Sequence, residues 1–93
     1  MSDLARLDAL VHGKVQGVYY RAFTFRVAKR LLVKGWVKNT RSGDVELRAE
    51  GTRDGLEALL KELKVGPSGA SVTKIDLTWS AYTGDFSSFE VRY

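Results

Sequence analysis

Apolar and polar residues alternate along several stretches of this chain, as they do in β-strands that bury one face. The alternation is clearest over residues 44–51, where three apolar positions are interleaved with the charged residues Glu46, Arg48 and Glu50. We expect this charged face to be exposed to water. Residues 40–44 predict a turn before this strand. Similar patterns predict further strands over residues 6–12, 34–39, 72–80 and 86–93.

Two other stretches carry apolar residues at intervals of three and four positions, which indicates helices that bury one face. The first runs from Arg21 to about residue 31, and its apolar stripe consists of Tyr20, Phe23, Val27 and Leu31. The second follows Thr52, a residue type that often caps a helix N-terminus. Its apolar stripe consists of Leu56, Leu59, Leu60 and Leu63.

The order of these elements predicts the fold. A strand, a helix, two strands, a helix and a strand, followed by a short final strand, is typical of the α+β ferredoxin-like sandwich. In that fold an antiparallel sheet carries two helices on one face. The length of 93 residues fits a single domain, which we expect to span residues 1–93.

Composition limits the classes of function. Lys and Arg number 15 and Asp and Glu number 11, which gives a formal net charge of +4 and favours anionic partners. Such partners include nucleic acids and small phosphorylated molecules. The chain has no cysteine, which excludes disulfides and thiolate chemistry. It has no apolar run long enough to cross a membrane and no secretory leader, so we expect a cytoplasmic protein.

The segment between the first predicted strand and the first predicted helix contains the most distinctive chemistry. Gly13 and Gly17 allow the backbone to bend where side chains would clash. A bend before a helix points backbone N–H groups into a concavity that favours anions, and the helix N-terminus adds partial positive charge. Arg21 begins the helix, and its planar guanidinium matches phosphate oxygens in bidentate fashion. The segment predicts a phosphate site, but a turn that merely starts the helix would carry the same glycines.

Two motifs resemble the signatures of the acylphosphatase family. GKVQGVYYR, residues 13–21, is similar to the signature in which a G-x-V-Q-G-V segment leads to an aromatic residue and an arginine. GWVKNTRSGDVELRAEG, residues 35–51, has every fixed position of the family's second signature. GPSGASVTKID, which begins at Gly66, is also similar to a loop of the family, and the resemblance extends from about residue 9 to residue 92. The family's fold is the ferredoxin-like sandwich that the hydrophobic pattern predicts.

The resemblance implies a hydrolase that cleaves acyl phosphates to a carboxylate and inorganic phosphate, without a metal or a cofactor. It implies that Arg21 binds the phosphoryl group and that Asn39 holds the attacking water. Backbone N–H groups of the loop are implied to share phosphate binding, over Val15, Gln16, Gly17, Val18, Tyr19 and Tyr20. Outside these motifs, Asn39 would be interpreted as a turn residue and Arg21 as a surface residue at a helix start.

Several residues near the motifs carry expectations of their own. Tyr19 and Tyr20 are expected to pack against the protein, Tyr20 against the stripe of the first helix. Gln16 is expected to hold the loop, and His12 is expected to be structural. Leu32 stands where the family usually carries glycine, and in a left-handed conformation it would cost about 1 kcal/mol.

Two other functions are compatible with such a fold. Ferredoxin-like sandwiches also bind RNA through the open face of the sheet, but Glu46 and Glu50 would repel a phosphate backbone there. A non-catalytic module that binds a phosphorylated ligand would not need both Arg21 and Asn39. Acylphosphatase-like domains also occur within larger proteins, but a chain that starts at Met1 and ends just after its last strand favours a free-standing enzyme. We therefore expect a monomer whose partner is a small acyl phosphate, with no nucleic acid and no membrane.

Overall fold

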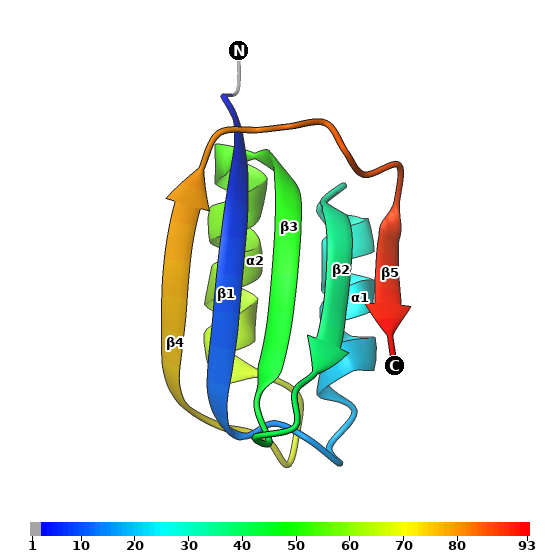
Figure 1. Cartoon of the computed structure of the whole chain (residues 1–93). Helices are drawn as coiled ribbons and strands as arrows, with labels where there is room; N and C mark the ends of the chain where they lie inside the picture. The colour runs from blue at the N-terminus through cyan, green and yellow to red at the C-terminus, as the bar shows by residue number, and fades with distance from the viewer. Residues whose placement is uncertain (1–2) are drawn as a thin grey trace.

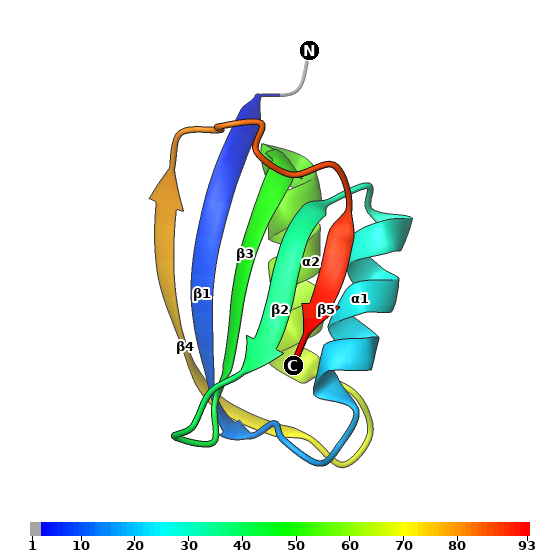
Figure 2. The same cartoon turned by 45° about the vertical axis from the view of Figure 1, so that its right-hand side comes forward.

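Two helices lie side by side against one face of a five-stranded sheet (Figure 1; Figure 2). The computed structural model describes residues 3–93. Its elements in chain order are β1 (Leu4–Lys14), α1 (Tyr20–Arg30), β2 (Lys34–Asn39), β3 (Val45–Thr52), α2 (Arg53–Val65), β4 (Ser71–Ser80) and β5 (Phe89–Arg92). The predicted strands and helices are all present, with ends that differ by a few residues.

The strands are arranged in the order β4-β1-β3-β2-β5. β1 pairs antiparallel with both β3 and β4, and β2 pairs antiparallel with β3. β5 instead runs parallel to β2 at the edge of the sheet. The predicted ferredoxin-like sandwich is confirmed, while the final strand makes its sheet mixed rather than wholly antiparallel. This direction brings the end of β5 to the same end of the sheet as the end of β2 (Figure 1).

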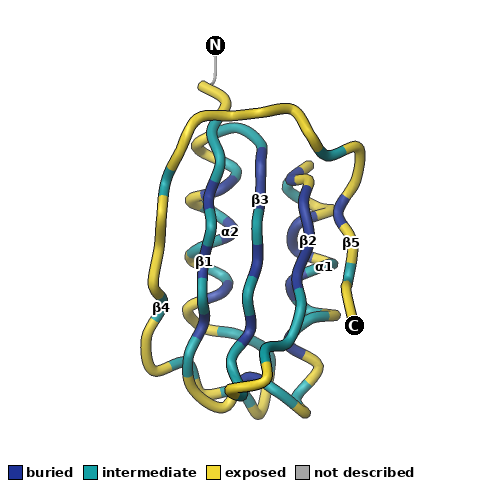
Figure 3. Tube along the Cα trace, viewed as in Figure 1, coloured by how far each residue is buried: buried dark blue, intermediate teal, exposed yellow. Residues whose placement is uncertain are grey.

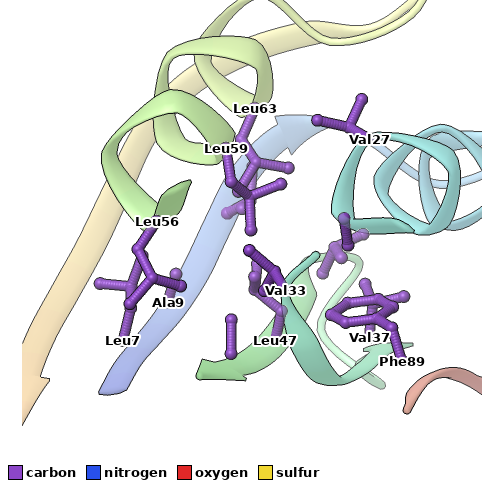
Figure 4. Packing of buried hydrophobic residues seen from close by; sticks show 14 of the residues in the cluster. Leu7, Ala9, Val27, Val33, Val37, Leu47, Leu56, Leu59, Leu63 and Phe89 are labelled. Carbon is purple, nitrogen blue, oxygen red and sulfur yellow. The ribbon is translucent and has the colours of Figure 1, made fainter. Parts of the chain in front are cut away.

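The core lies between the sheet and the helices (Figure 3; Figure 4). Fully buried leucines and valines from β1, β2, β3 and α2 meet there, among them Leu7, Val37, Leu47, Leu56, Leu59 and Leu63. Burial of each such side chain contributes about 1.5–3 kcal/mol to folding. The predicted stripe of α2 is confirmed at three of its four positions, since Leu60 is only partly buried.

Glu50 does not face water, contrary to the expectation from the alternating pattern of β3. Its exposed fraction is 2%, because the segment that joins β4 to β5 crosses the sheet at this end (Figure 1). The carboxylate of Glu50 accepts hydrogen bonds from the backbone N–H and hydroxyl of Thr83 and from the backbone N–H of Gly84. Burial raises the pKa of Glu50, but these hydrogen bonds and the charge of Arg6 outweigh it and lower the pKa below its ordinary value.

Gly13 lies inside β1, which continues to Lys14 rather than ending near residue 12. A bulge in the pairing with β4 falls between His12 and Gly13. A Cβ atom on Gly13 would collide with the backbone carbonyl oxygen of Ser71 on β4, so no other residue fits. The expected clash is confirmed here, whereas a Cβ atom on Gly17 would meet nothing within 4 Å.

Leu32 adopts the left-handed conformation in which the resemblance placed a glycine. Its φ angle is +59°, and its backbone N–H donates to the Lys29 carbonyl at 3.2 Å. The backbone N–H of Val33 donates to the Ala28 carbonyl at 2.9 Å, which completes a Schellman motif at the end of α1. The chain therefore turns from α1 into β2 in the usual way, and the leucine carries the backbone strain.

Candidate active site

The loop between β1 and α1 contains a run of backbone N–H groups, in residues 16–19, that find no backbone acceptor within residues 3–93. Gly17 has a φ angle of +75° and Tyr19 a φ angle of +62°, and these left-handed residues bend the loop. Among the backbone hydrogen bonds described for residues 3–93, none has a donor in residues 16–19. Backbone N–H groups are almost always paired in folded proteins, so a run of free donors indicates a place for an acceptor from outside.

The N-terminus of α1 adds to this positive character. Tyr19 occupies the N-cap position, and its side chain makes no capping hydrogen bond. The first turn of α1 contains no acidic residue. The partial positive charge of the helix end is therefore not neutralised by a neighbouring side chain. An anion in front of the loop would satisfy both the helix end and the free N–H groups.

Gln16 fixes the loop to the turn between β2 and β3. Its side-chain amide nitrogen donates to the carbonyl oxygens of Thr40 and Asp44, each at 2.8 Å. These two bonds span more than 20 residues of sequence and hold the loop beside the residue that ends β2, Asn39. The expectation that Gln16 holds the loop is confirmed.

A pocket of about 380 Å³ opens in front of the loop and contains both implied catalytic side chains. Arg21 of α1 and Asn39 of β2 line it, although the rest of α1 and most of β2 lie between them in the chain. The loop residues that line the pocket are Val15, Gly17, Tyr19 and Tyr20. Gln16 and Val18 do not line it, since Gln16 points to the β2–β3 turn and Val18 packs against the core.

The amide of Asn39 is not consumed by the turn that follows it. That turn is closed by Thr40, whose backbone N–H donates to the Asp44 carbonyl at 2.9 Å. The backbone N–H of Asp44 donates to the Thr40 hydroxyl at 3.1 Å. Within residues 3–93, none of the described hydrogen bonds involves the Asn39 side chain. The interpretation of Asn39 as a turn residue is therefore not supported, and its amide is available to a molecule in the pocket.

Arg21 is held by the last residues of the chain, which the sequence analysis did not identify. Its Nη1 atom donates to the backbone carbonyl of Arg92 at 3.1 Å. The guanidinium carbon lies 4.6 Å from the centre of the Tyr93 ring, which is a cation–π distance. No local motif signals this contact, because it depends on the parallel pairing of β5 with β2.

The two tyrosines of the loop have opposite environments. Tyr20 is 1% exposed, and its hydroxyl donates to the Leu63 carbonyl at 2.7 Å, so its expected packing role is confirmed. Burial raises the pKa of Tyr20 well above its ordinary value. Tyr19 is 84% exposed, and the expectation that it packs against the protein is wrong. The left-handed backbone at Tyr19 directs its ring away from the core, at the rim of the pocket.

His12 lies near the site but does not line the pocket. Its Nε2 atom is 2.8 Å from the Asp76 carboxylate, and its Nδ1 atom is 3.2 Å from that of Asp44. The hydrogen bond to Asp76 raises the pKa of His12; desolvation opposes it, and Asp44 adds to the rise. Asp44 also accepts a bond from Gln16, so His12 supports the same turn. Within residues 3–93, no cluster of three or more His, Asp and Glu side chains is arranged to hold a metal ion.

Comparisons with known proteins agree with the geometry. The family model described as Acylphosphatase matches residues 7–91. A curated protein named Acylphosphatase from an Anaeromyxobacter species is 46% identical over 93 residues, with 100% of both chains covered. The structure of acylphosphatase from Bacillus subtilis is 34% identical with a TM-score of 0.93, covering 96% of this chain and 99% of that one. The structure of an acylphosphatase from Coxiella burnetii is 40% identical with a TM-score of 0.87, covering 97% and 94%.

Proposed function

This chain belongs to the acylphosphatase family and hydrolyses acyl phosphates, and we propose that Arg21, Asn39 and the loop of residues 15–20 carry out the reaction. The observation that carries the assignment is the row of free backbone N–H groups in residues 16–19, beside the uncapped N-terminus of α1. Arg21 and Asn39 line a pocket that this loop borders.

In this proposal, the phosphoryl group binds to the loop and to Arg21. The backbone N–H groups donate to its oxygens, and the guanidinium donates a planar pair of hydrogen bonds. These donors are fixed before the substrate arrives, since Gln16 holds the loop and Arg92 holds Arg21. Donors that need no reorganisation stabilise the charge on the phosphoryl oxygens as the transition state forms.

Asn39 positions the attacking water in the proposed mechanism. Its amide oxygen accepts a hydrogen bond from the water, whose oxygen attacks phosphorus in line with the bridging oxygen. The bond from phosphorus to the bridging oxygen breaks, and its electron pair leaves with the carboxylate. An amide cannot take the water's proton, so that proton passes to a phosphoryl oxygen.

The leaving group explains why so few side chains are needed. The carboxylic acid that corresponds to the leaving group has a pKa of about 4, so the carboxylate is stable and leaves without receiving a proton from the enzyme. The remaining demands are the position of the water and the charge of the phosphoryl group, which the proposed residues supply. The products are the free carboxylate and inorganic phosphate. None of these steps requires a metal or a cofactor.

Hydrolysis of benzoyl phosphate in the presence of a chelator tests this proposal. Asn39→Ala is expected to lower kcat by at least about 100-fold while inorganic phosphate still competes as it does in wild type. Arg21→Ala is expected to lower kcat/KM by about 1000-fold or more and to abolish competition by phosphate. Arg26→Ala is the matched control, because Arg26 is an exposed arginine of the same helix that does not line the pocket.

Two outcomes would contradict the assignment. If Asn39→Ala turned over the substrate as fast as wild type, Asn39 would not position the attacking water. A loss of turnover in the Arg26 control as large as that in Arg21→Ala would attribute the effect to net charge rather than to a phosphate contact.

We further propose that the protein acts as a monomer in the cytoplasm and does not bind nucleic acid. Two cations on the open face of the sheet are paired with acids, Arg48 with Asp8 at 2.6 Å and Lys38 with Glu46 at 3.7 Å. A cation that is already paired with an acid neutralises a phosphate poorly, so it releases few counterions and contributes little to nucleic-acid binding. In the part of the chain that the structure describes, neither helix has the length and apolar character to span a bilayer. Size-exclusion chromatography tests the monomeric state, and a gel shift at low salt tests the absence of nucleic-acid binding.

A further inference from the structure

Two exposed tyrosine rings border the pocket that contains Arg21 and Asn39. Tyr19 is 84% exposed and Tyr93 is fully exposed, and both line this pocket. Tyr19 precedes α1 and Tyr93 follows β5, and the two meet there because β5 runs parallel to β2. The phosphoryl chemistry assigned above uses the backbone of the loop and the contact of Tyr93 with Arg21, and it leaves the Tyr19 ring and the exposed part of the Tyr93 ring without a role.

The position of Tyr19 is energetically unfavourable for the folded chain. The φ angle of Tyr19 is +62°, and a left-handed conformation brings the Cβ atom of a tyrosine too close to the following carbonyl oxygen. Its neighbour Tyr20 recovers free energy by burial, but Tyr19 remains exposed to water. Strain without compensation from packing is typical of residues that serve a bound molecule.

Tyr93 presents one face of its ring to the guanidinium of Arg21 and leaves the rest exposed. The ring is therefore next to the group that would bind phosphate and extends the pocket away from it. In an acyl phosphate, the acyl substituent is separated from phosphorus only by the bridging oxygen and the carbonyl carbon. A phosphoryl group bound at Arg21 would thus place the acyl substituent near the two tyrosine rings.

We propose that Tyr19 and Tyr93 bind the acyl half of the substrate and favour acyl phosphates with a planar, aromatic or conjugated acyl group. This inference rests on the proposed function of the pocket. Aromatic rings attract one another beyond the area that they bury, whereas a methyl group gains little from two solvent-exposed rings. A small acyl phosphate such as acetyl phosphate would still reach Arg21 and Asn39, but without contact to the tyrosines.

The test compares kcat/KM for benzoyl phosphate with kcat/KM for acetyl phosphate in each variant. Tyr19→Asn removes the ring with a residue that tolerates the left-handed conformation, and the benzoyl-to-acetyl ratio is expected to fall about threefold to tenfold. Tyr19→Phe keeps the ring and is expected to keep the ratio. Tyr93→Leu is expected to lower both rates, because Arg21 loses its contact, and to lower the ratio as well. Tyr82→Asn is the control, since Tyr82 is also exposed but does not line this pocket.

The ratio makes the test independent of folding. A variant that is partly unfolded loses both activities equally and leaves the ratio unchanged, and thermal unfolding of each variant identifies such a loss. An unchanged ratio in folded Tyr19→Asn and Tyr93→Leu would overturn the inference and leave the proposed function intact. A wild-type protein that hydrolyses neither substrate would overturn the proposed function itself.

Discussion

Leu32 is a position at which one substitution should stabilise the protein. Its φ angle of +59° costs a leucine about 1–2 kcal/mol, and glycine occupies this region freely. Glycine also gives the unfolded chain more freedom, which costs about 0.4–1 kcal/mol on folding. The leucine side chain is 82% exposed, so its removal loses little burial. We therefore expect Leu32→Gly to stabilise the fold by about 0.7 kcal/mol, the difference between these two effects.

Thermal and urea unfolding measure this gain. For a domain of this size, about 0.7 kcal/mol corresponds to a rise in Tm of about 3–6 °C. The matched control is Leu32→Ala, which removes the same side chain but keeps a Cβ atom in the left-handed conformation. Leu32→Ala should lie close to wild type, whereas Leu32→Gly should be more stable than both. If Leu32→Gly were no more stable than Leu32→Ala, backbone strain at this residue would not be the reason for the effect.

Three further substitutions test other parts of the structure. Glu50→Gln should cost about 1–3 kcal/mol in urea unfolding, because an amide cannot accept all the hydrogen bonds from Thr83 and its neighbour. Since the pKa of Glu50 is lowered by folding, this cost should be full near neutral pH and vanish as the pH falls through that pKa. Folding raises the pKa of His12, so protonated His12 stabilises the folded protein. His12→Ala should therefore cost stability in full below the ordinary histidine pKa of about 6.5, and this cost should disappear as the pH rises through the pKa of His12 in the folded protein. A loss that grew with pH would contradict the pairing with Asp76. In a thermal melt, Gly13→Ala should lack the cooperative unfolding transition that wild type shows at its Tm. The added Cβ atom would collide with the backbone of β4 and prevent the native pairing.

The parts of the site that depend on neighbouring residues could be predicted from the sequence. The loop before α1 and the residue that ends β2 both lie inside continuous motifs, so Arg21 and Asn39 could be named without coordinates. The role of Gln16 followed in the same way. Each of these residues lies inside a continuous motif, although the bonds of Gln16 reach a turn more than 20 residues away.

The remaining parts depend on chain segments that meet only in the folded protein. Glu50 is buried because the connection from β4 to β5 crosses over it, and alternation within β3 contains no trace of that crossing. Tyr93 meets Arg21 because β5 joins the far edge of the sheet in parallel. The packing expected for Tyr19 is wrong because two adjacent tyrosines look alike in the sequence, whereas the backbone at the first of them is left-handed and turns its ring outward.

The direction of β5 also determines how the protein can be handled in the laboratory. An affinity tag or fusion partner attached after Tyr93 would begin beside Arg21, where it would compete for the guanidinium and obstruct the pocket. β1 starts at Leu4 at the opposite end of the sheet (Figure 1). A partner attached before β1 would leave the pocket open. Recombinant protein for kinetic work should therefore carry its tag at the N-terminus, and an apparently inactive preparation tagged at the other end would reflect the attachment rather than the enzyme.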